Sequence, residues 1–498
     1  MKNITAVIEF SLINIQFVIA QKIDDNIKIL ESASFPIELY NISDNKERLK
    51  EISKICNILI EIKRSIKSYG INLRTVKLFA GDSLKDLKNK EFIREQIRIK
   101  TGFNLDILDA SKETVFLYKK MLSLYGEHLK KELAMFLFMS YDKISFYILA
   151  KGRVLYFQSI SMTPIKLKEI LLELNLHPEK TEIVIEEYLK NYFDMFKNFL
   201  PGKLPENLFI ISENFGDVFG SKKNLSKDIL SKIDKLVYLS EIKLKKEFHL
   251  DDDDLKFFKE KLLMARATIK SSKISNIHCI NYSLINTILH NSFFVGTRRK
   301  FDAEVRISTL KSCEYLGKRY LNDEAHTGNV KIYGRLIFNE LAKLHQLTSR
   351  DLLILEGACI LHDIGKFVNL RDHYKTSYEL IKNSSIFGYS DEEQKKVAIL
   401  SYFHSKKEPS LTHEYFLRYT DSEKIRLIKL CAILRVADAL DRSHKQHIKD
   451  ITIKITDNHM SFEVPIAEDP LIEKWAFEKK SGLFSEVFGL NIKLNLRR

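Results

Sequence analysis

The chain has 498 residues, enough for about three or four domains. Its hydrophobic content of 45% is normal for a globular protein and excludes a chain too polar to build a core. The formal net charge of +14 favours polyanionic ligands such as nucleotides, polyphosphate, nucleic acid or anionic lipid, and it fits a lysine-rich solvated surface equally well.

The first predicted elements are two strands in the apolar run Ile4–Ala20, with a turn near Leu12–Asn14. Glu9 interrupts this run, one lysine precedes it and no small-residue cleavage site follows, so it fits a signal peptide and a membrane-spanning helix poorly. Five cysteines without CxxC spacing predict free buried thiols in a reducing compartment. These are Cys56, Cys279, Cys313, Cys359 and Cys431. We therefore expect a cytoplasmic protein that does not enter a membrane.

Two similar patterns of strands and helices follow one another ahead of Phe301. In the first, the opening hairpin is followed by a helix, a strand, a helix and a strand over 47–67, 76–79, 92–100 and 105–108. In the second, three strands, two helices and a strand are expected over 135–138, 144–150, 154–160, 164–174, 181–199 and 208–211. Two such units in series predict a duplicated α/β architecture. The acidic run Asp251–Asp254 is interpreted as a helix start, because a calcium loop needs alternating ligands and a glycine.

From about Phe301 to Leu440 helical periodicity dominates the sequence. Helices are expected over 307–321, 330–345, 349–364, 374–383, 391–404 and 422–440. Beyond them, strands over 451–455 and 460–464 form a hairpin across Asp457–Asn458, and a closing strand is expected over 490–496. The second part of the chain is therefore predicted to be a helical domain with a small tail.

Four residues of the helical part carry the strongest chemical signal: His326, the pair His362–Asp363, and Asp438. Each element of this order comes from a separate predicted helix, and Gly365 is placed to end the helix that carries the pair. Imidazole nitrogen and carboxylate oxygen suit a divalent metal, which activates water and polarises phosphoryl oxygens. A lone His-Asp dipeptide is a weak signal, but four ligands in this order predict a divalent-metal site.

Further basic and imidazole groups lie close to these ligands in the sequence, as phosphate oxygens require. The predicted substrate-binding residues are His373, Lys375, Lys406 and Arg442, and the predicted catalytic residues are Asp363, Lys366 and His404. Any one of these cations taken alone fits an exposed helix end equally well.

Four stretches of the helical part match a known pattern in combination: Leu361–Lys366, His373–Ile381, Phe403–Pro409 and Leu434–Ser443. They resemble the HD superfamily of metal-dependent phosphohydrolases, and more closely the HD-type helical domain of the Ppx/GppA family, the exopolyphosphatases and guanosine pentaphosphate phosphohydrolases. The resemblance implies that the metal site accepts Mn, Fe, Mg, Co or Ni. It also implies an α/β plus all-α fold. This fold consists of two actin-like, ribonuclease H-like α/β subdomains over 1–122 and 123–298, a helical HD-type domain over 299–448, and a small β tail (an α/β segment over 449–498).

The predicted actin-like half departs from the family pattern where the family binds phosphate. Leu12 replaces a small polar residue of the first phosphate loop, and Tyr141 and Asp142 replace glycines of the second, so phosphate has poorer access to the backbone. Glu9 and Glu113 are the carboxylates that remain in this cleft. We therefore interpret the front half as a scaffold, a dimerisation surface or an anion-binding regulator.

These resemblances imply a phosphohydrolase whose metal-dependent HD domain cleaves phosphoester or phosphoanhydride bonds in a nucleotide, alarmone or polyphosphate. The expected partners are this phosphate-rich anion and a second copy of the chain in a homodimer, and nucleic acid is not expected. Two alternatives stay open. One is a non-catalytic regulator that binds polyphosphate or a nucleotide, and the other is residual exopolyphosphatase activity through Glu9 and Glu113.

Overall fold

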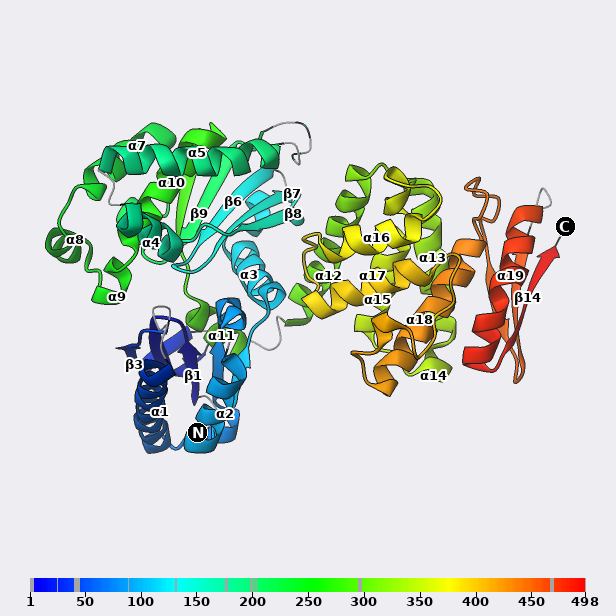
Figure 1. The fold of residues 1–498 in the computed structure, drawn as a ribbon, viewed down its shortest axis with the longest axis horizontal. Helices are drawn as coiled ribbons and strands as arrows, with labels where there is room; N and C mark the ends of the chain where they lie inside the picture. Colours follow the sequence, from blue (N-terminus) through cyan, green and yellow to red (C-terminus); the bar gives the residue numbers. More distant parts are fainter. Residues whose placement is uncertain are drawn as a thin grey trace. The chain divides into compact units, whose positions relative to one another are not determined.

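The computed structural model describes residues 4–497 except 25, 40–44, 88, 130–131, 175–177, 198–199, 201, 203, 294–297 and 466–469. The chain forms two compact units, Met1–Val305 and Arg306–Arg498. The first unit is built on two mixed sheets, and the second is mostly helical (Figure 1). Among the described residues, we find no helix with the length and apolar character needed to cross a membrane.

The first sheet has five strands in the order β3-β2-β1-β4-β5. Strands β1 to β5 are Ile4–Phe10, Asn14–Ile23, Asn26–Pro36, Lys77–Ala80 and Leu105–Ile107. The first three form an antiparallel meander, and β4 and β5 run parallel to β1. The turn between β1 and β2 is held by Ser11, whose hydroxyl accepts a hydrogen bond from the Asn14 N–H at 2.9 Å. Helices α1 (Asn45–Ser68) and α2 (Lys90–Thr101) make the crossovers that parallel strands require.

The second sheet repeats this arrangement. Strands β6 to β11 are Leu133–Met139, Ile144–Ala150, Arg153–Ile160, Asn207–Ser212, Lys223–Leu225 and Asn276–Asn281. The order β8-β7-β6-β9-β11 is again an antiparallel meander followed by two parallel strands, and β10 adds an antiparallel edge. Because both sheets have the strand order of ribonuclease H-like subdomains, the predicted duplicated, actin-like architecture is confirmed.

The helices of the first unit surround these sheets (Figure 1). Helices α3 to α11 are Ala110–Leu129, Pro164–Leu174, Pro178–Lys197, Phe215–Phe219, Ser226–Val237, Glu241–Phe248, Asp252–Leu255, Phe258–Ser272 and Leu284–Phe293. Helices α3, α6, α7, α8, α10 and α11 were not among the predicted elements. At the start of α9, the Asp251 side chain accepts a hydrogen bond from the Asp254 N–H at 2.7 Å, and Asp254 accepts one in return. The acidic run is therefore a helix start, as predicted.

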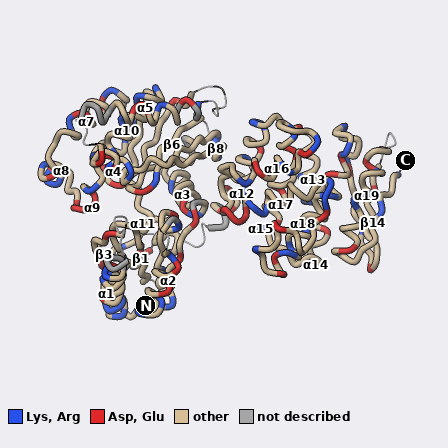
Figure 2. Tube along the Cα trace, in the orientation of Figure 1, with Lys and Arg blue, Asp and Glu red and all other residues tan. Residues whose placement is uncertain are grey.

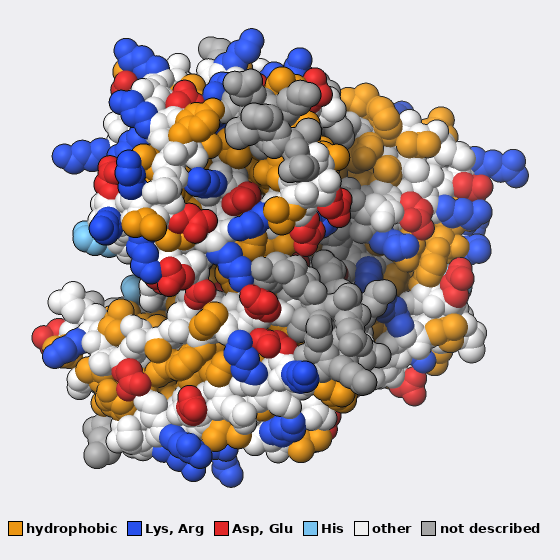
Figure 3. All heavy atoms as spheres, turned by 60° about the vertical axis from the view of Figure 1, so that its left-hand side comes forward, with side chains coloured by type: hydrophobic (Ala, Val, Ile, Leu, Met, Phe, Trp, Pro, Cys, Tyr) orange, Lys and Arg blue, Asp and Glu red, His pale blue; other side chains and the backbone are white. Residues whose placement is uncertain are grey.

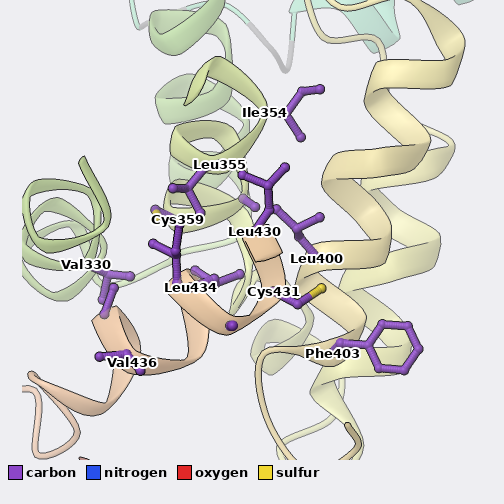
Figure 4. Packing of buried hydrophobic residues seen from close by; sticks show 14 of the residues in the cluster. Val330, Ile354, Leu355, Cys359, Leu400, Phe403, Leu430, Cys431, Leu434 and Val436 are labelled. Atoms are coloured by element: carbon purple, nitrogen blue, oxygen red, sulfur yellow. The ribbon is translucent and has the colours of Figure 1, made fainter. Parts of the chain in front are cut away.

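The second unit packs its helices around one apolar core. Helices α12 to α18 are Arg298–Arg319, Glu324–Glu340, Ala342–His345, Ser349–Leu361, His373–Lys382, Asp391–Phe403 and Asp421–Ala439. Figure 4 shows how Val330 on α13, Leu355 on α15, Leu400 on α17 and Leu434 on α18 meet in this core. All four side chains are buried. The ends of the same helices carry the predicted metal ligands, so the core fixes the positions of those ends.

A small α/β tail closes the second unit. Strands β12 (Thr452–Ile455), β13 (His459–Pro465) and β14 (Asn491–Arg497) form a sheet, and helix α19 (Leu471–Phe488) lies between β13 and β14 in the sequence. The expected hairpin and closing strand are confirmed. Helix α19 packs against α18 and contributes Phe477 and Phe484 to the helical core. The tail is thereby joined to the helix that carries Asp438.

Basic and acidic residues are interspersed along the trace of both units (Figure 2). On the face in Figure 3, Lys and Arg side chains likewise lie beside Asp and Glu side chains. Many charged side chains are therefore compensated locally, as in the pairs of Arg94 with Glu91 and of Arg98 with Glu95, and +14 is the remaining net charge. Exposed pairs of this kind contribute little to stability.

Candidate metal centre

The four predicted ligands converge in the helical unit. His326 lies in the first turn of α13 because the Asp323 side chain caps this helix, accepting a hydrogen bond from the His326 N–H at 3.1 Å. His362 and Asp363 lie between the end of α15 and the 3-10 turn η4 (Ile364–Phe367), and Asp438 lies in the last turn of α18. All four side chains are buried.

Their ligand atoms lie within coordination distance of one another. His326 Nε2 is 3.3 Å from His362 Nε2, and Asp438 Oδ1 is 3.4 Å and 3.5 Å from these two nitrogens. Asp363 Oδ2 is 3.8 Å from His326 Nε2 and 3.5 Å from His362 Nε2. Around an ion with bonds of about 2.1 Å, neighbouring ligand atoms lie about 3.0–3.4 Å apart. The set therefore fits one ion with small adjustments.

The second ring nitrogens fix which atoms face this set. His362 Nδ1 lies 2.9 Å from the Cys359 carbonyl oxygen, and His326 Nδ1 lies 3.0 Å from Asp441 Oδ2. Because these oxygens only accept, both Nδ1 atoms carry hydrogen, and in neutral rings both Nε2 atoms present lone pairs. In neutral rings these two lone pairs, 3.3 Å apart, cannot bond to each other, whereas a metal ion, or a proton on His326, between them satisfies both.

His373 and His404 form a second donor set with the other oxygen of Asp363. Their Nε2 atoms are 3.3 Å apart, and each is 3.4 Å from Asp363 Oδ1. Their Nδ1 atoms face the carbonyl oxygens of Leu370 and Ser401, at 3.1 Å and 2.5 Å. Ligand atoms lie within 4.8 Å of one another in two groups: His326, His362 and Asp363, and Asp363, His373 and His404. Asp363 thus offers one oxygen to each set, which is the arrangement that holds two neighbouring ions.

Charge and burial give most of these groups the protonation states that ligands need. Burial lowers the pKa of His373, and it lowers the pKa of His404 to about 4, so both rings are neutral at pH 7. Burial by itself raises the pKa of Asp363, but His362, His404 and Lys366 bring it well below its ordinary value. This carboxylate is therefore ionised at neutral pH, as metal binding requires.

Asp438 and His326 also shift each other's pKa values. Burial by itself raises the pKa of Asp438, but Lys480 and the hydrogen bonds from His326 and His362 bring it well below its ordinary value. Burial by itself lowers the pKa of His326, but hydrogen bonds to Asp438 and Asp441 raise it to about 9. An ion in the first set therefore has to replace a proton on His326 at neutral pH.

Two of the predicted phosphate-binding or catalytic cations contact the carboxylates of the centre. Lys366 Nζ is 2.5 Å from Asp363 Oδ2, and Arg442 Nη1 is 3.9 Å from Asp438 Oδ2. Both cations are partly exposed, at 32% and 39% of the side chain. Lys375 instead lies 3.9 Å from Asp372 Oδ2, and Lys406 donates to the Arg371 carbonyl oxygen at 2.8 Å. These two lysines therefore contact the segment just before α16.

Sequence analysis did not select three residues that contact the ligands of the centre. Asp441 orients His326, and His444 stacks on the His326 ring at 3.7 Å between ring centroids. Lys480 on α19 bonds to Asp438 Oδ2. Asp441 and His444 follow Asp438 within two helical turns, which is a usable signal. Lys480 interrupts the apolar face of α19, and that interruption was its only signal.

The two carboxylates that remain from the family cleft lie in a cavity of the first unit. This cavity, of about 500 Å³, is lined by Glu9, Glu113, Asp142 and Glu213 among others. Glu113 accepts a hydrogen bond from the Asp82 N–H at 2.8 Å and pairs with Lys143 Nζ at 2.7 Å. Its carboxylate is thus occupied by internal partners. Lys143 and Lys166 also line the cavity, so its carboxylates are partly offset by positive charge.

Glu9 gives this cavity a pH dependence that affects stability. Burial, with Glu213 and Glu113 nearby, raises the pKa of Glu9 from 4.5 to about 8. The folded protein therefore keeps a proton that the unfolded chain releases, and stability from this group is complete below pH 4.5 and lost as the pH rises to about 8.

Glu9→Gln avoids this loss, so it should melt like the wild type near pH 5 and at a higher temperature near pH 9. Thermal melts at both pH values, with the exposed Glu91→Gln as control, measure the difference. An equal difference at both pH values would contradict the prediction.

Comparison with known proteins supports the resemblance seen in the sequence. A family model described as Ppx/GppA phosphatase, domain III, matches residues 305–480. This match confirms the resemblance to the Ppx/GppA family over the helical unit. A solved structure of the Aquifex aeolicus Ppx/GppA protein is 14% identical, with a TM-score of 0.47, and the match covers 59% of this chain and 98% of that one. An exopolyphosphatase from Cytophaga hutchinsonii is 12% identical with a TM-score of 0.46, covering 58% and 97%.

Proposed function

We propose that the protein is a metal-dependent phosphohydrolase whose reaction takes place at the HD-type centre of the helical unit. The observation that carries the proposal is the shared carboxylate Asp363, with two imidazole nitrogens facing each of its oxygens. The chemistry of the donors fits divalent ions, and the imidazole ligands suit Fe or Ni better than Mg, which prefers oxygen ligands. When bound, such ions activate water and offset the charge of phosphoryl oxygens.

Two groups of residues would bind the ions, and further residues would bind the substrate. His326, His362, Asp363 and Asp438 hold the first ion, and Asp363, His373 and His404 hold the second. His373 and His404 were expected to bind phosphate and to act in catalysis, but their buried Nε2 atoms face Asp363, so we assign them as ligands. Lys366 and Arg442 are partly exposed beside the carboxylates and are placed to bind the phosphate group of a substrate. Lys375 and Lys406 would contact the substrate further from the carboxylates of the centre.

The substrate we propose is a phosphoester or phosphoanhydride of the nucleotide, alarmone or polyphosphate class. Residual exopolyphosphatase activity in the first unit is disfavoured because Glu113 is engaged by Lys143 and the Asp82 N–H. A regulator that binds phosphate without cleaving it would use the same cations and differ only in turnover. A homodimer and a cytoplasmic location stay predictions.

A hydrolysis panel tests the proposal. Purified full-length protein is assayed with Mn²⁺ against nucleoside triphosphates, guanosine pentaphosphate, polyphosphate and simple phosphate esters. We expect hydrolysis that is lost on chelation, restored by added metal and unchanged in Glu113→Gln, because that carboxylate lies outside the centre. Activity that survives in His362→Ala but is lost in Glu113→Gln would move the reaction to the first unit and reject the proposal. Binding without turnover would favour the regulator.

A further inference from the structure

Helix α19 places a lysine in the middle of its buried face. Ala476, Phe477, Leu483 and Phe484 on this face are buried against the helical unit, and Lys480 lies among them with 9% of its surface exposed. A lysine is rarely buried unless it is paired, because removing an ammonium group from water is costly. Its position on the apolar face therefore needs a partner that compensates the charge.

That partner is a ligand of the candidate metal centre. Lys480 Nζ bonds to Asp438 Oδ2. The other oxygen, Oδ1, is the one that lies 3.4 Å from His326 Nε2 and 3.5 Å from His362 Nε2. Asp438 is itself 1% exposed, so solvent offers it little compensation. The lysine thus fixes which carboxylate oxygen faces the ion.

A second contact fastens the same helix to the loop after Asp438. The buried Glu473 side chain, two turns before Lys480 on α19, accepts a hydrogen bond from the Ser443 N–H at 2.9 Å. Because Ser443 follows Asp438 by five residues, α19 holds this end of α18 at two points. The position of the ammonium group relative to Asp438 is therefore set by the fold, and the flexibility of a long side chain contributes little.

We propose that Lys480 is a positioning residue that acts as an internal counter-cation of Asp438 and thereby weakens the first ion site, so that the centre exchanges its ion as free metal varies. This inference rests on the metal binding of the proposed function and is independent of turnover. A fixed positive charge on Oδ2 competes with the ion for the charge of the same carboxylate. Without it, the buried carboxylate keeps only the partly exposed Arg442, 3.9 Å from Oδ2, and the proton on His326 that an ion has to replace. The ion is therefore bound more tightly.

Two variants that differ in charge test this role. Lys480→Met removes the ammonium group and keeps the apolar stem, whereas Lys480→Arg keeps a positive charge. In metal-depleted full-length protein, we expect Lys480→Met to melt at a lower temperature than the wild type. It should nevertheless bind Mn²⁺ about tenfold more tightly, or better, in calorimetric titration. Added Mn²⁺ should raise its melting temperature by more than it raises that of the wild type. Lys480→Arg should bind Mn²⁺ with wild-type affinity.

The neighbouring Lys479→Met, on the exposed face of α19 beside Trp475, is the matched control and should change neither quantity. If Lys480 only supported the fold, Lys480→Met would lower both the melting temperature and the Mn²⁺ affinity, and the inference would be wrong. Absence of Mn²⁺ binding in the wild type would also reject it. None of these measurements uses hydrolysis, so an inactive protein whose Lys480→Met variant binds Mn²⁺ more tightly would reject the proposed function and leave this inference standing.

Discussion

Asp363→Asn should reduce hydrolysis by about a thousandfold or more, comparable to the largest single losses of electrostatic stabilisation in an active site. An asparagine has one oxygen and an NH₂ group that cannot accept, so it serves at most one of the two donor sets. The substitution also removes the negative charge that Lys366 and the histidines compensate. We therefore expect metal content, measured by elemental analysis, to fall together with kcat/KM.

The control for this variant is Asp421→Asn, a substitution of the same chemistry at a highly exposed position in the first turn of α18. It should keep both activity and metal content. Asp363→Asn protein that is folded, retains two ions and hydrolyses substrate at the wild-type rate would show that the shared carboxylate is not part of the reaction.

Gly365→Ala should lower the free energy of unfolding by about 3 kcal/mol or more. A Cβ atom at Gly365 would lie 2.1 Å from the His373 carbonyl oxygen and 2.5 Å from the Ser377 backbone nitrogen. Because these are backbone atoms of α16, a rotamer change cannot relieve the contact. The same glycine donates its N–H to the Ser377 hydroxyl at 2.9 Å, so a shift would move α16 and His373 with it. Urea denaturation measures the loss, and metal titration should show weaker binding at the second set.

Gly328→Ala on α13 provides the contrast, because a Cβ atom there meets nothing within 4 Å. Alanine has the higher helix propensity, so this variant should be stabilised by roughly 0.5–1 kcal/mol. If Gly365→Ala were as stable as Gly328→Ala, the close packing of the His-Asp turn against α16 would not be what requires a glycine at 365.

The sequence pattern predicted the residues of the centre better than their roles. Residue type and order were enough to select His326, His362, Asp363 and Asp438, which the structure brings together. His373 and His404 were expected near the site as phosphate-binding and catalytic groups. Their assignment as ligands depends on which ring nitrogen is engaged, and that is decided by the carbonyl oxygens of Leu370 and Ser401. Each carbonyl lies three residues before its histidine, a contact that depends on backbone conformation and is invisible in the sequence.

The predicted boundaries of helices were wrong where a cap or a local break sets the observed boundary. The helix carrying His326 was expected to begin at Val330, but Asp323 caps it and it begins at Glu324. The same predicted helix was expected to reach His345, whereas α13 ends at Glu340 and α14 follows as a separate short helix. Lys480 could not be predicted because no helix was assigned to the residues between the hairpin and the closing strand of the tail. A lysine in an unassigned segment is most simply interpreted as surface.

The order of these groups along the chain has a consequence for how the protein is made. Domains generally fold as they leave the ribosome, the earlier part of the chain first. The sheets of Met1–Val305 can therefore fold while the groups of the centre, spread from His326 to Lys480, are still being synthesised. Because Asp438 is the last of the proposed ligands to emerge, metal loading should be a late step of maturation. Protein made under metal starvation should accordingly accumulate with a finished first unit and an unloaded second one.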